Sequence, residues 1–133
     1  MKKRGILNSE LSWLIADLGH KDKIVLADAG LPVGKKVYKL DLAVSCGTPD
    51  LMSVLSVILS EMKVEHVEMA QEIKQENKTM LKKISEILPD ETDSNFVSHN
   101  EFKKHTLKCK AVIRTGECTP YSNIILRSGV NFD

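Results

Sequence analysis

Apolar residues recur along this chain with two different spacings, and their alternation limits the folds open to it. Leu11, Leu14, Ile15 and Leu18 follow the period of a helix. The run KIVLAD at 23–28 is short, β-branched and bounded by charges, as in a buried strand. Segments of both kinds follow one another to the end of the chain. This order predicts an α/β fold in which helices lie on the faces of a central sheet of short strands.

The same reading gives approximate bounds for the elements. A chain of 133 residues has the usual length of one domain, so we expect a single domain over 1–133. Asn8 or Ser9 can cap the first helix, and Gly19 suits a left-handed residue that closes it. The loop PDETDS at 89–94 precedes a strand that ends at His99. The expected helices are 9–18, 49–62, 73–88 and 100–108, and the expected strands are 23–28, 36–44, 63–70, 95–99, 110–116 and 123–129.

Composition and charge exclude several classes of protein. The chain is 42% hydrophobic and 28% charged, as in ordinary globular proteins. Its 19 basic residues are scattered among 18 acidic ones, so no concentrated basic field exists to displace counterions from nucleic acid. No apolar run is long enough to span a bilayer. We therefore expect neither nucleic-acid binding nor membrane insertion.

The N-terminus and the cysteines bear on the compartment. MKKRGILNSE carries the basic residues of a signal peptide but lacks the long apolar run that would follow, so we expect a cytoplasmic protein. Cys46, Cys109 and Cys118 are odd in number and show no CxxC spacing. This pattern favours reduced thiols over a disulfide framework.

Common cofactor and nucleophile motifs are absent from the sequence. It contains no P-loop, GxGxxG, HExxH or GxSxG pattern. His105 and Cys109 lie on one face of an expected helix, but a structural zinc site requires four ligands. We therefore assign no cofactor and no metal ligand.

Two titratable residues flank the first expected strand. His20 follows a helix end, where an imidazolium can interact with exposed carbonyls, or where an imidazole can act as a general acid or base. Asp28 ends the strand, where it can form a turn with backbone N–H groups or accept hydrogen bonds from sugar hydroxyls in a crevice at the sheet edge. Both interpretations of each residue remain open on spacing alone.

The segment before the last strand contains a second polar group. Tyr121 and Asn123 could serve packing and a turn, or could present a flat ring and an amide to a hydroxylated ligand. Glu117 and Arg114 flank Gly116, and we expect them to form a structural salt bridge.

Three long stretches of this sequence are specific: LGHKDKIVLADAGLP, SHNEF and AVIRTGECTPYSNIILRSGV. Together they closely resemble the D-ribose pyranase and fucose mutarotase family, and the resemblance runs from Met1 to Phe132 and is weakest over 74–94. The loop DAGLP resembles the ribose pyranase branch. The resemblance implies an isomerase that interconverts the β-pyranose and β-furanose forms of D-ribose without metal or nucleotide, in the cytoplasm beside a ribose uptake system.

The resemblance also implies roles for particular residues and an assembly. His20 matches the family's proton donor, and Asp28, His99, Tyr121, Ser122 and Asn123 match its sugar-binding positions. Ser122 replaces an alanine common in the family, which should matter little if the backbone makes the contact. Helix one and strand one are expected to meet at a corner, so that His20 and Asp28 reach one pocket. Family members resemble one another in forming decamers of two pentameric rings, with pockets near subunit contacts.

Three alternatives remain. A mutarotase for fucose or another sugar is the nearest enzymatic one. A sugar-binding partner of a ribose transporter would use the same pocket without catalysis. A structural protein would use its histidines only for capping and packing.

Overall fold

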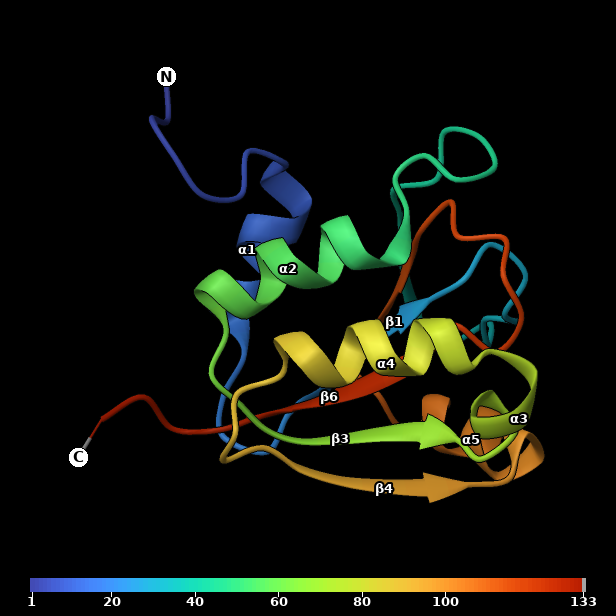
Figure 1. The fold of residues 1–133 in the computed structure, drawn as a ribbon. Helices are drawn as coiled ribbons and strands as arrows, with labels where there is room; N and C mark the ends of the chain where they lie inside the picture. The colour runs from blue at the N-terminus through green and yellow to red at the C-terminus, as the bar shows by residue number, and fades with distance from the viewer. Residues whose placement is uncertain (133) are drawn as a thin grey trace.

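The computed structural model describes residues 1–132. They form one mixed sheet with helices on both of its faces (Figure 1). The strands are β1 (Lys23–Ala27), β2 (Tyr38–Asp41), β3 (Val64–Ala70), β4 (Asp93–Val97), β5 (Ala111–Arg114) and β6 (Ile124–Ser128), in the spatial order β2-β5-β1-β6-β3-β4. The helices are α1 (Ser9–Asp17), α2 (Leu51–Glu61), α3 (Ile73–Glu76), α4 (Lys78–Ile87) and α5 (His99–Thr106). The predicted α/β fold with a central sheet and helices on its faces is confirmed.

Five of the six strands run in the same direction. β1 is parallel to β5, β5 to β2 and β3 to β4, whereas β6 is antiparallel to both of its neighbours, β1 and β3. The carboxyl ends of the five strands therefore meet the beginning of β6 at one edge of the sheet. We call this the carboxyl edge, and the opposite one the amino edge.

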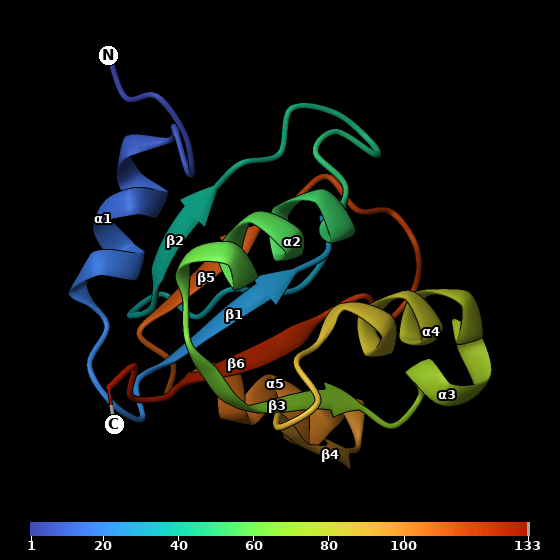
Figure 2. The ribbon, with the colours of Figure 1, turned by 60° about the vertical axis from the view of Figure 1, so that its left-hand side comes forward.

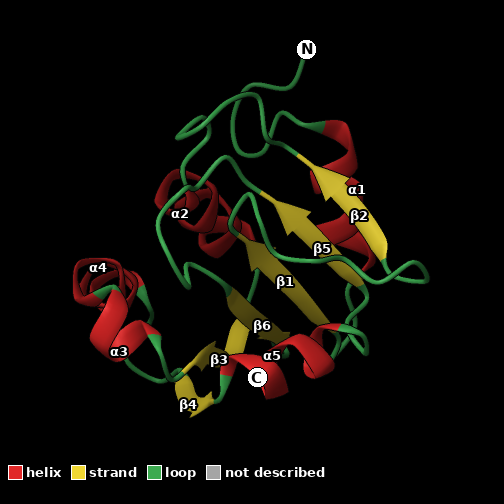
Figure 3. Ribbon diagram, turned by 90° about the vertical axis from the view of Figure 1, so that its right-hand side faces the viewer, coloured by secondary structure: helices red, strands yellow, loops and turns green. Residues whose placement is uncertain are grey.

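Alternating side chains of the central strands divide the core between the two faces of the sheet. Ile24 and Leu26 point to the face covered by α1, α2 and α4, whereas Val25 and Ala27 point to the face covered by α5. Figures 2 and 3 show α2 and α4 on one side of the strands and α5 on the other. Both faces of β1 are buried, which is why its sequence is a continuous apolar run rather than an alternating one.

The helices begin at capping side chains. Asn8 Oδ1 accepts a hydrogen bond from Leu11 N at 2.9 Å at the start of α1, as the sequence suggested. Helix α1 closes without a left-handed Gly19; the left-handed residue is Lys21, with φ of 73°. The single helix predicted over 73–88 is divided at Asn77 into α3 and α4. His99 is the first residue of α5 rather than the last residue of a strand.

Two loops pack tightly at the carboxyl edge. A Cβ atom on Gly116 would lie 2.5 Å from the carbonyl oxygens of Ser45 and Thr48, so only glycine fits there. Cys46 and Cys118, whose Cα atoms are 5.8 Å apart, form a disulfide between these loops. The prediction of reduced thiols is therefore wrong for this pair, because residues 72 positions apart in sequence become neighbours only in the fold.

Cys109 remains free and lies in the core beneath α5, where burial raises the pKa of its thiol to about 11. The reactive thiolate is therefore scarce at neutral pH. No helix within residues 1–132 is both long enough and apolar enough to cross a membrane.

The number of free thiols tests the Cys46–Cys118 disulfide. We expect the air-oxidised native protein to react slowly with a thiol reagent at pH 7, and the unfolded, unreduced protein to release one thiol, that of Cys109. Reduction before unfolding should release all three cysteines. Three thiols without reduction would contradict the Cys46–Cys118 pair, and a Cys109→Ser variant identifies the single thiol.

Candidate functional site

Four of the six predicted site residues meet at the carboxyl edge. Asp28, His99, Tyr121 and Asn123 line a cavity of about 220 Å³ together with the loop that follows β1. The four residues come from the end of β1, the start of α5 and the segment that enters β6. Because β6 is antiparallel to β1, the residues preceding β6 lie beside those following β1. The topology of the sheet thus gathers these four residues.

Asp28 and Asn123 form a reciprocal pair on one side of this cavity. Asp28 N donates to Asn123 Oδ1 at 2.8 Å, and Asn123 Nδ2 donates to Asp28 Oδ2 at 3.1 Å. Asp28 Oδ1 accepts from Gly30 N at 3.0 Å, which is the predicted turn. Each carboxylate oxygen has two lone pairs, so Asp28 keeps acceptor capacity for a hydroxyl group. The turn interpretation and the ligand interpretation of Asp28 are therefore compatible.

Two aromatic side chains form another wall. The rings of His99 and Tyr121 meet edge to face, with centroids 5.1 Å apart, and the His99 ring also stacks on Phe102 at 6.5 Å. Tyr121 has a left-handed backbone with φ of 55°, which is unusual for a bulky residue. In the part of the chain that the structure describes, His99 Nδ1 is the only buried side-chain polar atom without a hydrogen-bond partner.

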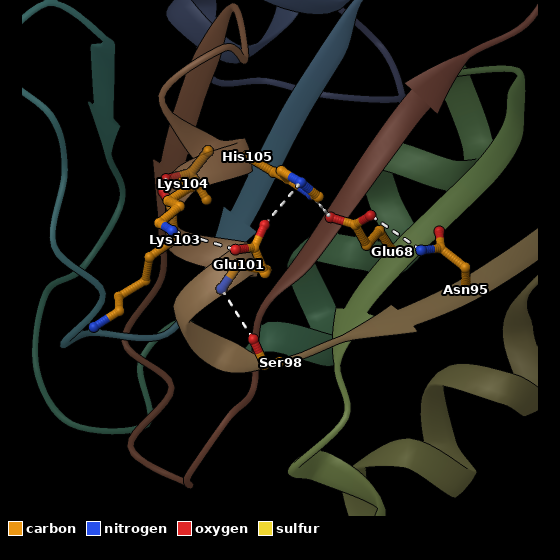
Figure 4. Close-up of polar contacts among 8 residues, drawn as sticks. Glu68, Asn95, Ser98, Glu101, Lys103, Lys104 and His105 are labelled. Carbon is orange, nitrogen blue, oxygen red and sulfur yellow. Dashed lines mark hydrogen bonds and ion pairs between the residues drawn. The ribbon is translucent and has the colours of Figure 1, made fainter.

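Helix α5, which carries His99, is tied to the sheet by a cluster of polar side chains (Figure 4). His105 Nδ1 lies 2.6 Å from Glu68 Oε2 on β3, and its Nε2 lies 3.8 Å from Glu101 Oε2. Asn95 on β4 donates to Glu68 Oε1 at 3.1 Å. Figure 4 shows His105 between the two carboxylates. These contacts give His105 a structural role that fixes the helix behind the cavity.

Ser122 is fully buried and its hydroxyl faces away from the cavity. Its Oγ lies 2.6 Å from Thr119 Oγ1 and accepts from Asn77 Nδ2 at 3.1 Å. A contact between Ser122 and a ligand in the cavity would therefore use the backbone, whereas the hydroxyl bonds to neighbouring side chains.

His20 lies at the amino edge, away from the other predicted residues. It lines a separate cavity of about 520 Å³ with Leu18, Lys63 and Phe132, among others. Five residues of β1 separate this end from Asp28, a length of about 17 Å at the rise of a strand. The expectation that His20 and Asp28 of the same chain reach one pocket is wrong, because β1 is extended between them.

Glu65 on β3 contacts the imidazole of His20. His20 Nε2 lies 3.2 Å from Glu65 Oε2, and Arg127 Nε donates to Glu65 Oε1 at 2.9 Å. Burial raises the pKa of the Glu65 carboxyl, but the hydrogen bond and charge of His20, together with Arg127, outweigh it and leave the pKa below its usual value. The imidazole is thus oriented by a carboxylate rather than by the helix carbonyls considered from sequence.

Sequence reasoning missed several polar residues that support these sites. The predicted Arg114–Glu117 salt bridge does not form: Arg114 pairs with Asp41 at 3.1 Å. Glu117 is instead buried and accepts from Leu51 N, at the start of α2, at 3.0 Å. Glu65 is 45 positions from His20 and leaves no local signal in the sequence. Among residues 1–132, no three His, Cys, Asp or Glu side chains are grouped as a metal site would require.

Comparison with known proteins gives concordant matches over nearly the whole chain. The model of the RbsD / FucU transport protein family matches residues 1–131. The D-ribose pyranase of Geobacillus thermodenitrificans is 52% identical over 132 residues, which cover 99% of each chain. That of Lactiplantibacillus plantarum is 50% identical and is covered completely by the match, which takes in 99% of this chain.

Solved structures agree with the fold. Bacillus subtilis RbsD complexed with D-ribose superposes with a TM-score of 0.95 at 51% identity, over 99% of this chain and 100% of that one. The fucose mutarotase of Streptococcus pneumoniae, in complex with L-fucose, gives a TM-score of 0.70 at 24% identity over 95% of both chains. The second match bears on the fold alone.

Proposed function

The chain belongs to the RbsD / FucU transport protein family, and we propose that it is an isomerase that interconverts the β-pyranose and β-furanose forms of D-ribose. The observation that carries this proposal is its identity of about 50%, from end to end, with proteins named D-ribose pyranase. The fold shared with a ribose-bound relative supports it further. The fucose mutarotase is much less similar, so ribose is the better-supported sugar.

The reaction requires two proton movements. Changing the ring size breaks the bond between C1 and the ring oxygen, gives the open-chain aldehyde, and closes the ring through the hydroxyl on C4 instead of C5. Opening requires an acid at the ring oxygen and a base at the C1 hydroxyl, and closure reverses these roles. Positioned acid and base groups contribute about 10²- to 10⁴-fold in rate.

The residues of the carboxyl-edge cavity are suited to binding the sugar. Asp28 and Asn123 offer an acceptor and an amide to neighbouring hydroxyls, and Tyr121 offers an apolar ring surface. His99 lines the same cavity, and its imidazole can hold a hydroxyl or exchange a proton with it. We assign sugar binding to Asp28, His99, Tyr121 and Asn123, with Ser122 acting through its backbone.

We propose that His20 supplies the proton donor and that it comes from another copy of the chain. Within one copy β1 holds His20 about 17 Å from Asp28, far beyond the reach of a hydrogen bond. His20 is 44% exposed and can therefore meet the cavity of a neighbour. Two different patches that meet in this way form a head-to-tail interface, which closes into a ring when the rotation allows. A decamer of two pentameric rings, in the cytoplasm, is our proposal for the assembly.

Two rival functions predict different outcomes with the same sugars. A sugar-binding partner of a transporter would bind ribose without accelerating the exchange between its ring forms. A mutarotase for another sugar would act on that sugar in preference to ribose. Saturation-transfer NMR on a panel of pentoses and deoxyhexoses, with ribose binding measured by calorimetry, distinguishes these cases.

Replacing the proton donor should abolish catalysis but not folding. We expect His20→Ala to lower the enzyme-dependent exchange between ribose anomeric signals by about 10²- to 10⁴-fold, because the acid at the ring oxygen is lost. His66→Ala is the matched control, since His66 lies on β3 and lines neither cavity. Full exchange in a folded His20→Ala protein would remove His20 from the mechanism.

Replacing the Asp28 carboxylate should weaken the binding of ribose. Asp28→Asn keeps the size of the side chain but places an amide group opposite Asn123 and weakens the acceptor for sugar hydroxyls. Hydrogen bonds to charged groups are about twice as strong as neutral ones, so ribose affinity should fall about tenfold. Calorimetric titration tests this, and an unchanged affinity would contradict the assigned role of Asp28.

Mixing the two impaired variants tests whether the site is shared between copies. When His20→Ala and Asp28→Asn chains are co-expressed at equal levels, about one quarter of the interfaces pair an intact His20 with an intact Asp28 from the other chain. At ribose concentrations well below the dissociation constant, exchange should then return to about one quarter of the wild-type rate, whereas Asp28→Asn alone retains about one tenth and His20→Ala almost none. Activity no higher than the mean of the two variants would place the whole site in one chain.

A further inference from the structure

We propose that α3 and the residues at its two ends form a positioning segment. In this segment, Asn77 holds the loop on both sides of Tyr121, and Glu72 holds the backbone of His99. The inference rests on the proposed function, because it concerns the cavity to which ribose is assigned. It gives a role to a part of the chain in which no site residue was predicted.

Asn77 contacts the Tyr121 loop from the start of α4. Its Oδ1 accepts from Met80 N at 3.3 Å and caps the helix. Its Nδ2 donates to Pro120 O at 2.9 Å and to Ser122 Oγ at 3.1 Å. The two donor contacts thus fall on the residues immediately before and after Tyr121. One side chain caps α4 and also fixes the loop through its amide N–H groups.

These contacts matter because Tyr121 has a backbone conformation that it would not adopt unaided. A bulky residue at a φ of 55° persists only where its surroundings hold it, and such residues cluster at functional sites. Asn123 N donates to Tyr121 O at 2.9 Å, which tightens the turn from the other side. Release of this turn would move the Tyr121 ring away from His99 and the cavity.

The donor from Asn77 begins a chain of hydrogen bonds that ends on a buried carboxylate. Thr119 Oγ1 donates to Glu117 Oε2 at 2.8 Å, so Ser122 Oγ must supply the hydrogen in its contact with Thr119. Ser122 can then accept from Asn77. Each hydroxyl then donates once and accepts once. Because the hydrogen of Ser122 goes to Thr119, its oxygen offers position 77 only lone pairs, which suit a donor there.

Glu72 makes the corresponding contact on the other aromatic residue. Both of its carboxylate oxygens accept from His99 N at 3.0 Å, at the first turn of α5. The carboxylate therefore stabilises one of the unpaired N–H groups of the helix and lies at its positive end. Four residues of α3 join Glu72 to Asn77, so both contacts are made by one short segment of the chain.

The test separates the loop contact from the helix cap. Asn77→Asp keeps an acceptor for Met80 N but cannot donate to Pro120 O, and its second oxygen faces that carbonyl. Asn8→Asp is the matched control: Asn8 caps α1 in the same way through Leu11 N, remote from the cavity. Asn77→Ser also keeps a capping oxygen, is too short to reach the loop, and replaces the aspartate variant if that one does not fold.

We expect Asn77→Asp to raise the KM for ribose about fivefold, the scale of one lost hydrogen bond, with kcat changed less than twofold because His20 is untouched. Asn8→Asp should leave both parameters unchanged, and both variants should unfold at similar temperatures. Glu72→Ala should also raise KM, whereas Glu72→Gln, which retains an acceptor oxygen, should restore most of the loss. A purely structural role for Asn77 would lower the active fraction, and hence the apparent kcat, at constant KM.

A KM for Asn77→Asp within twofold of that for Asn8→Asp would overturn the positioning role. The proposed function is tested separately by the wild-type protein in the same spectra, since its failure appears as the absence of accelerated exchange. If the wild type binds ribose without exchange, the dissociation constant replaces KM, and an unchanged value in Asn77→Asp refutes the inference in that case.

Discussion

Antiparallel pairing of β6 between β1 and β3 is the constraint on which the arrangement of the molecule depends. The other five strands share one direction, so their carboxyl ends lie at one edge, and β6 alone begins there. Tyr121 and Asn123, which precede β6, are thereby placed beside Asp28, which follows β1. A sixth parallel strand would deliver these residues to the opposite edge. The direction of β6 thus determines which residues surround the cavity at the carboxyl edge.

Polar side chains fix the loop that carries Tyr121 at that edge. Glu117, Thr119 and Ser122 are linked by hydrogen bonds beneath the cavity, and Glu117 and Ser122 are buried. A buried polar group left without a partner costs about 1 to 3 kcal/mol, so such a network favours a single arrangement of the loop. Capping side chains take part in it, since Asn77 and Glu117 each serve a helix as well as the Tyr121 loop. The left-handed Tyr121 is stable in this setting.

The two ends of β1 divide the proposed chemistry between copies of the chain. Asp28, at one end, lines a cavity and is hydrogen-bonded to Asn123, whereas His20, at the other end, is exposed and contacts Glu65. In the proposed mechanism the first end binds the sugar and the second donates the proton. Catalysis by such an arrangement depends on assembly, because a single copy contains both groups but cannot bring them to one sugar.

The sequence by itself determined the α/β class, the order of helices and strands, and four of the residues that line the carboxyl-edge cavity. The continuous apolar run at 23–28 and the helical spacing at 11–18 suffice for the elements, because burial imposes these periods locally. The resemblance of LADAGLP and PYSN to a known family indicated Asp28, Tyr121 and Asn123. Only the tertiary structure decided the separation of His20 from Asp28, the Cys46–Cys118 disulfide, the partners of Glu117 and the break at Asn77. Each of these depends on contacts between residues far apart in sequence, whose proximity follows from strand order and direction and leaves no mark on local periodicity.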